Sequence, residues 1–187
     1  GNHHFPALAR TALAEALKEC APSPNLQYTA YASGGGEAID IALKTARHAT
    51  KRKKIISIKK AYHGHTGLAV KAGDDRFSKL FLSEDVNDEF IQVTFNDLTE
   101  MEDALKGRDV AAVILETIPA TYGFPMPNEG YLTSVKRLCE KYETLMKNEL
   151  DVSKAPYSPN IVYESILAVL PSIELVDSRY EDSSYIF

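Results

Sequence analysis

A short strand-like run that leads into three consecutive glycines and then a helix is the most constraining feature of this sequence. Residues 27–32 (QYTAYA) carry tyrosines and a threonine, which favour β-strands. Residues 37–50 repeat small and apolar side chains at three- and four-residue steps, as an amphipathic helix does. Between them, residues 34–36 (GGG) are too flexible to favour helix or strand, so we expect a turn there.

Such a turn suits an anion. Glycines let backbone N–H groups approach a ligand closely, and a helix that begins at Glu37 adds the partial positive charge of its N-terminus. Phosphate is the expected ligand. The pattern is neither a Walker A loop nor a GxGxxG fingerprint. Taken alone, a plain tight turn before a helix explains it equally well.

Strand-like and helix-like segments alternate along most of the chain. Strands are predicted at residues 54–59, 91–95 and 110–115, the last being a continuous apolar run (VAAVIL) typical of a buried parallel strand. Helices are predicted at residues 6–20, 98–106 and 131–142. The alternation predicts an α/β fold in which helices cover both faces of a mostly parallel sheet.

Polar residues follow two of these strands. Residues 62–67 (YHGHTG) come after the strand at 54–59, and Glu116 comes directly after VAAVIL. Ligands of parallel sheets bind at the carboxyl ends of strands, so these residues and the glycines can converge on one site. Each also has a structural explanation: Tyr62 as a half-buried tyrosine, His63 as a hydrogen-bonded loop residue, and Glu116 as a cap on a strand end.

Three longer segments carry a family resemblance. They are ASGGGEAIDIALKTAR (32–47), KIISIKKAYHGHTG (54–67) and AAVILETIPATYGFPMPNEGYLTSVKRLCEKYETL (111–145). In order and spacing they resemble the class III aminotransferases, which include ornithine, acetylornithine and GABA transaminases. The resemblance covers about residues 5–145. It implies part of the large domain of fold-type I PLP-dependent transferases, a three-layer αβα structure with a mostly parallel sheet.

The resemblance also implies roles for single residues. Gly35 and Gly36 would donate backbone N–H groups to the phosphate of pyridoxal phosphate (PLP). Tyr62 would stack on the pyridine ring, since a flat aromatic face suits a flat cofactor. His63 would follow it on the cofactor or substrate side, and Glu116 would orient polar groups beneath the ring.

Other parts of the family pattern have no counterpart in this chain. The Asp that binds the pyridinium nitrogen would fall near Glu149, where the surrounding pattern fails, and Thr121 stands where many members carry a second acid. No lysine here lies in the context of the family's Schiff-base lysine, which serves as covalent anchor and as base. We therefore expect no turnover by this chain alone, and the resemblance by itself leaves its status as an enzyme open.

The end of the chain resembles a different family. We place a boundary between a partial aminotransferase domain at 1–146 and a short tail at 147–187. Residues 148–180 resemble the 2-keto-4-pentenoate hydratase/4-oxalocrotonate decarboxylase family, in which a carboxylate at the position of Glu174 binds a divalent metal. A single carboxylate cannot hold Mg²⁺ usefully, so Mg²⁺ is not expected and Glu174 also fits a surface acid. The junction suggests a gene fusion, a chimera or a faulty gene model.

These observations favour an aminotransferase-derived domain that binds PLP and, when completed, takes an amino donor and a keto acid. The alternatives are a non-catalytic remnant or half of a split enzyme acting through protein contacts, and a metal-dependent hydratase-like fragment. We expect a homodimer or association with another chain. The net charge of −5 gives no pull toward nucleic acid or membrane. With no visible signal peptide and no CxxC motif, we expect a cytoplasmic location.

Overall fold

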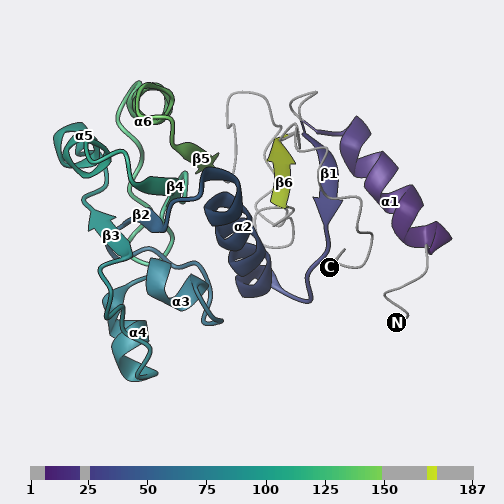
Figure 1. Cartoon of the computed structure of the whole chain (residues 1–187), viewed down its shortest axis with the longest axis horizontal. Helices are drawn as coiled ribbons and strands as arrows, with labels where there is room; N and C mark the ends of the chain where they lie inside the picture. The colour runs from purple at the N-terminus through teal and green to yellow at the C-terminus, as the bar shows by residue number, and fades with distance from the viewer. Residues whose placement is uncertain (1–6, 22–25, 149–167, 172–187) are drawn as a thin grey trace. The chain divides into compact units, whose positions relative to one another are not determined.

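The computed structural model describes residues 7–21, 26–148 and 168–171 (Figure 1). Its helices are α1 (Leu8–Glu19), α2 (Gly35–Thr50), α3 (Ala69–Ala72), α4 (Asp75–Leu80), α5 (Leu98–Leu105) and α6 (Tyr131–Lys141). Its strands are β1 (Leu26–Ala30), β2 (Lys54–Ile58), β3 (Phe90–Val93), β4 (Val110–Leu115), β5 (Leu145–Asn148) and β6 (Ala168–Pro171).

The chain divides into two compact units. One comprises residues 1–29 and 169–187, and the other comprises residues 30–168. In the first unit α1 buries none of its residues, and β1 pairs with β6 in a two-stranded sheet. The second unit holds a four-stranded sheet together with the glycines and the polar residues that follow the predicted strands. The functional argument therefore concerns the second unit.

The four-stranded sheet is parallel throughout, in the order β3-β2-β4-β5. Ile56 of β2 lies opposite Ile91 of β3 on one side and Val113 of β4 on the other. All six residues of β4 are buried, as expected for a strand with neighbours on both edges and helices on both faces. The predicted α/β fold with a parallel sheet is confirmed.

Helices cover the two faces of this sheet separately. Ile56 and Ile58 of β2 pack in one hydrophobic cluster with residues of α5 and α6. Ile55 of β2 packs in a second cluster with residues of α2 and α3. Neighbouring residues of a strand point to opposite faces, so one short strand serves both clusters. The result is the three-layer αβα arrangement visible in Figure 1.

Two elements of the second unit are not apparent in the sequence. The helix α4 begins after Asp74, whose side chain accepts a hydrogen bond from the Arg76 N–H. The strand β5 ends in polar residues, yet its backbone pairs with β4 along its whole length. Leu145 lies opposite Ala112 at one end, and Asn148 lies opposite Leu115 at the other. An N-cap contact and an open strand edge thus create elements that side-chain periodicity alone does not predict.

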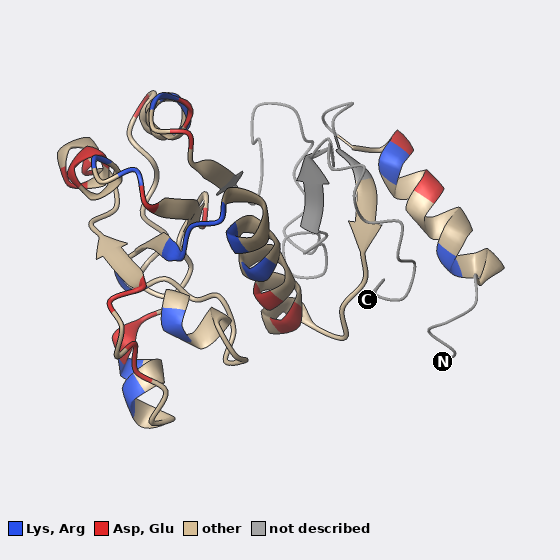
Figure 2. Ribbon diagram, in the orientation of Figure 1, with Lys and Arg blue, Asp and Glu red and all other residues tan. Residues whose placement is uncertain are grey.

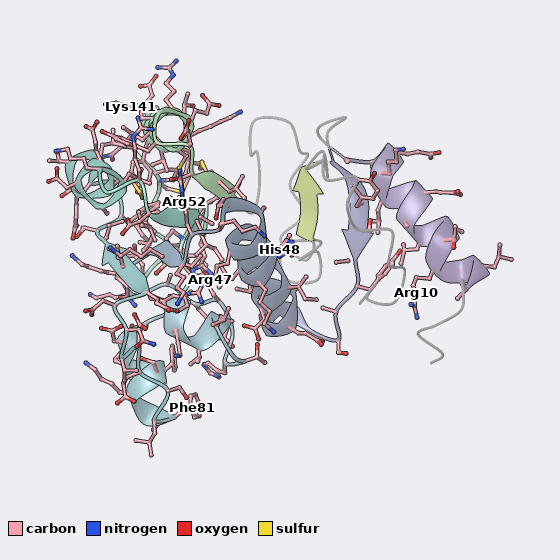
Figure 3. All side chains as sticks on the ribbon, in the orientation of Figure 1. Arg10, Arg47, His48, Arg52, Phe81 and Lys141 are labelled. Carbon is pink, nitrogen blue, oxygen red and sulfur yellow. The ribbon has the colours of Figure 1, made fainter. Side chains whose placement is uncertain are left out.

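Arg52 joins three segments at the amino edge of the sheet. Its Nη1 atom donates to the backbone oxygens of Val110 (3.3 Å), Tyr142 (3.2 Å) and Glu143 (2.9 Å). The side chain is 20% exposed and also lies 3.7 Å from the Glu143 carboxylate. Figure 3 labels Arg52 near β4 and β5. This residue therefore links the start of β2 to the turn that leads into β5.

We expect Arg52→Lys to lower the free energy of unfolding by about 1–3 kcal/mol, because a lysine keeps the charge but cannot reach all three carbonyls. Urea denaturation would measure the change. Lys53→Met is the control, since the Lys53 side chain is 81% exposed and should matter by less than about 0.5 kcal/mol. Equal stability of the Arg52→Lys variant and the native chain would contradict this role.

Candidate functional site

The three glycines form the start of α2. Gly34 is the N-cap, with extended backbone (φ −170°, ψ 171°), and the helix begins at Gly35. The expectation of a turn over all three glycines and a helix from Glu37 is wrong by two residues. The reason is that the residues of a first turn have helical dihedrals before any of their N–H groups is bonded within the helix, and side-chain periodicity does not mark this boundary in a run of glycines.

The N-terminus of α2 is arranged to leave its first N–H groups available. The first helical hydrogen bond runs from the Ala38 N–H to the Gly34 oxygen (3.1 Å), so the N–H groups of Gly35 and Gly36 precede the helical ladder. The Glu37 carboxylate accepts from the Ser33 N–H at 2.7 Å. Acidic residues gather toward the N-terminal end of α2 and basic residues toward its C-terminal end, as the helix dipole favours (Figure 2).

The loop after β2 lies directly against this first turn. A Cβ added to Gly64 would lie 2.6 Å from the Gly36 Cα, and one added to Gly36 would lie 2.8 Å from the Thr66 Oγ1. Gly64 also has a φ of +102°, which side-chain-bearing residues rarely adopt. The structure thus brings the glycines of α2 and the YHGHTG segment together, two elements that the sequence placed about 25 residues apart.

Asp40 is a second link between α2 and this loop. Its side chain is buried, and its Oδ1 accepts from the Ala69 N–H at 2.8 Å. Asp40 is not among the residues that the sequence motifs predict for the site. A signal was present, however, because Asp40 stands on the buried face of α2 beside Ile39 and Leu43, where an unpaired carboxylate would be costly.

Tyr62 and His63 have different surroundings. The Tyr62 ring is 42% exposed and makes edge contacts with His65 (5.2 Å between centroids) and Phe77 (5.9 Å). His63 is buried, and its neighbour His65 packs against the Phe81 ring at 5.1 Å. Tyr62 therefore has an accessible ring at the loop surface. That it stacks on a cofactor stays a prediction.

Glu116 lies half-buried directly after β4, at the same edge of the sheet as Tyr62. The Thr121 Oγ1 donates to the Lys60 oxygen at 2.5 Å, which ties the loop after β4 to the loop after β2. Burial and, to a smaller extent, the nearby Glu116 charge raise the pKa of Tyr122. The loops that follow β2 and β4 thus meet, and Glu116 begins the second of them.

The topology favours a ligand at this junction. The chain leaves β2 toward β3 on one side, whereas it leaves β4 toward β5 on the other. The connections diverge between β2 and β4, and such a switch point opens a crevice beyond the carboxyl ends of the strands. The two loops that carry Tyr62 and Glu116 begin at these strand ends.

The predicted metal ligand Glu174 lies outside the described residues. So does Glu149, which stands near the position of the family's pyridinium-binding Asp. Within the described part of the chain, no group of three or more His, Cys, Asp or Glu side chains could hold a metal ion. Among these same residues, no helix is both long and apolar enough to cross a bilayer.

Comparison with known proteins decides the family. The model of the family described as aminotransferase class-III matches residues 3–147. The chain belongs to this family. An uncharacterized aminotransferase of Archaeoglobus fulgidus is 46% identical over 146 residues, which are 78% of this chain and 34% of that protein. A glutamate-1-semialdehyde 2,1-aminomutase of Symbiobacterium thermophilum is 36% identical over 142 residues, which are 72% of this chain and 32% of that protein. This class III chain therefore spans about a third of the length of these relatives.

Solved structures agree on the fold. A taurine:2-oxoglutarate aminotransferase from Bifidobacterium kashiwanohense, in complex with PLP and glutamate, superposes with a TM-score of 0.67 at 28% identity. The match covers 80% of this class III chain and 39% of the taurine aminotransferase chain. An (S)-enantioselective omega-transaminase from Thermomicrobium roseum gives a TM-score of 0.70 at 25% identity. The match covers 78% of this chain and 38% of the omega-transaminase chain. The described fold is therefore that of part of a PLP-dependent transaminase.

We expect Gly64→Ala to lower the free energy of unfolding by about 1–3 kcal/mol, because it combines a strained φ with a collision against the backbone of Gly36. Thermal or urea denaturation would measure this. Gly34→Ala is the matched control, since a Cβ there meets no atom within 4 Å and its backbone is extended. A Gly64→Ala variant as stable as Gly34→Ala would show that the close approach does not constrain the fold.

Proposed function

We propose that this chain supplies the PLP phosphate site of a class III aminotransferase. The observation that carries the proposal is the first turn of α2, where Gly35 and Gly36 present N–H groups at the carboxyl edge of a parallel sheet. On one side the turn is closed by the contact of Gly36 with Gly64, while beside Gly34 a Cβ would meet nothing within 4 Å. This combination of close backbone and open space fits a phosphate group.

The other predicted residues take roles around that phosphate. Tyr62 offers an exposed ring for the flat face of the pyridine, and His63 follows it in the same loop. Glu116, at the end of β4, orients polar groups below the ring. When bound, PLP supplies the electron sink that allows an amino group to move from an amino donor to a 2-oxo acid or aldehyde.

Amino transfer belongs to the proposal for the assembled protein. No lysine of these 187 residues lies in the sequence context of the family's Schiff-base lysine. We therefore expect this chain to bind PLP through its phosphate and to need a lysine contributed from elsewhere in the assembled protein or by a partner chain. The amino donor and the keto acid would then bind above Tyr62.

We expect Gly35→Pro to weaken PLP binding about 10- to 100-fold, because it removes one N–H that donates to a charged oxygen. Proline is well accepted at the first position of a helix, and the extended backbone of Gly34 suits the residue before proline. Titration followed by PLP absorbance would measure the affinity. Pyridoxal, which has no phosphate, is titrated in parallel and should bind both proteins equally weakly.

Gly35→Ala is the control variant, since it keeps the N–H and adds a similar restriction of the backbone. It should bind PLP more tightly than Gly35→Pro, because only the proline variant lacks the N–H. The proposal fails if PLP binds the native chain no better than pyridoxal does, or if Gly35→Pro leaves the PLP affinity unchanged.

We propose, further, that the chain associates with a second copy through apolar residues 80–82 at the C-terminal end of α4. Leu80, Phe81 and Leu82 are 71%, 48% and 87% exposed, and Figure 3 shows Phe81 at the outer end of α4. Contiguous exposed apolar side chains are a mark of interaction surfaces. The surface adjoins the Tyr62 ring through His65 and Phe77. A partner there would lie beside the proposed cofactor site.

Light scattering should give about twice the 20.7 kDa mass of one chain, and Leu82→Asp should return the mass to one chain. A charge placed in an apolar contact is costly, which is the reason for the change. Leu8→Asp is the control, because Leu8 is 88% exposed on α1 in the other unit. A native chain that stays monomeric, or a dimer that survives Leu82→Asp, would contradict this surface.

A further inference from the structure

Asp40 joins two elements that are distant in the sequence. It lies on the second turn of α2, one helical turn after Gly36, and is 8% exposed. Its Oδ1 accepts from the N–H of Ala69, 29 residues away, at 2.8 Å. Ala69 opens the short helix α3, so Asp40 provides from a neighbouring helix the acceptor that a residue at the N-cap usually provides.

Space beside Asp40 is kept for its carboxylate. Gly67 has a φ of +21°, and a Cβ there would lie 2.7 Å from the Asp40 Oδ2. The carboxylate is therefore enclosed between Gly67 and the Ala69 N–H. Because residues four apart on a helix lie on one face, Asp40 and Gly36 contact the same loop at successive turns. Gly36 meets it at Gly64, and Asp40 meets it at Gly67 and Ala69.

We propose that Asp40 is a positioning residue that holds the 62–69 loop against the first two turns of α2. This inference rests on the proposed function of those turns as the phosphate site. The contacts of Gly36 with Gly64 and Thr66 all lie on the first turn of α2, whereas the contacts of Asp40 with Gly67 and Ala69 lie one turn further and fix the direction of the loop. Asp40 thus makes the phosphate site and the loop bearing Tyr62 and His63 one rigid unit. A buried hydrogen bond to a carboxylate is stronger than one between neutral groups, which suits this task.

The test compares Asp40→Ala, Asp40→Asn and Asp97→Ala in the full chain. Asp97 caps α5 by accepting from the Glu100 N–H at 2.9 Å, so its removal deletes a similar bond on the other face of the sheet. The readout is the ratio of PLP affinity to pyridoxal affinity. We expect Asp40→Ala to lower this ratio at least about fivefold and Asp40→Asn, which keeps an acceptor, to recover most of it. Asp97→Ala should lower the melting temperature without changing the ratio.

Amide hydrogen exchange provides a second readout that needs no ligand. The Ala69 N–H should exchange at least about tenfold faster in Asp40→Ala than in the native chain, with amides of β4 unchanged. If Asp40→Ala does not fold, the same comparison is made with Asp40→Asn, whose weaker neutral bond should still raise the Ala69 rate. An unchanged Ala69 rate would overturn the inference, and so would an unchanged affinity ratio in a folded Asp40→Ala when the native chain prefers PLP to pyridoxal.

The two proposals fail in different ways. If the native chain binds PLP no better than pyridoxal, the phosphate site is refuted, whereas faster Ala69 exchange in the variant still supports the hold of Asp40 on the loop. If the native chain prefers PLP strongly and Asp40→Ala keeps that preference, the phosphate site stands and the role of Asp40 is refuted.

Discussion

Close packing of two glycine backbones, Gly36 on α2 and Gly64 in the loop after β2, governs the geometry of this protein's candidate site. Neither position leaves room for a Cβ without a shift of its neighbours. The loop therefore lies against the helix at a separation set by backbone atoms rather than by adaptable side chains. Backbone atoms have few alternative positions, so the N–H groups of the first turn and the residues that follow Gly64 keep a defined relationship.

Sheet topology determines where this contact occurs. The C-terminus of α2 leads through a short connection into β2, so α2 runs antiparallel to β2 and its N-terminus lies at the carboxyl edge of the sheet. The same edge receives the loops after β2 and β4, joined by the bond from Thr121 to Lys60. The positive end of a helix dipole and the open end of a switch point thus coincide. That coincidence makes the edge suitable for an anionic cofactor.

Two polar side chains fix the sheet unit at its opposite edges. Arg52 donates to three carbonyls where β4 and the turn before β5 begin, and Asp40 accepts from the first N–H of α3 at the other edge. In both cases a charged group satisfies backbone groups from distant parts of the chain, which apolar packing cannot do. The two clusters of the core supply most of the burial, whereas these residues determine how the connecting segments lie on it.

Much of this arrangement was predictable from the sequence. The apolar run of β4, the periodicity of α2 and the glycine and YHGHTG motifs determined the fold class, the family and the segments that form the candidate site. These features depend on local composition and spacing, which the sequence records directly. The tertiary structure alone decided that α2 begins at Gly35, that β5 adds to the edge of β4 and that Asp40 binds the Ala69 N–H. The pairing of β5 and the bond of Asp40 depend on contacts between segments far apart in the chain, which no local pattern of side chains specifies. The start of α2 is a local boundary that side-chain periodicity cannot locate, because glycines carry no side chain.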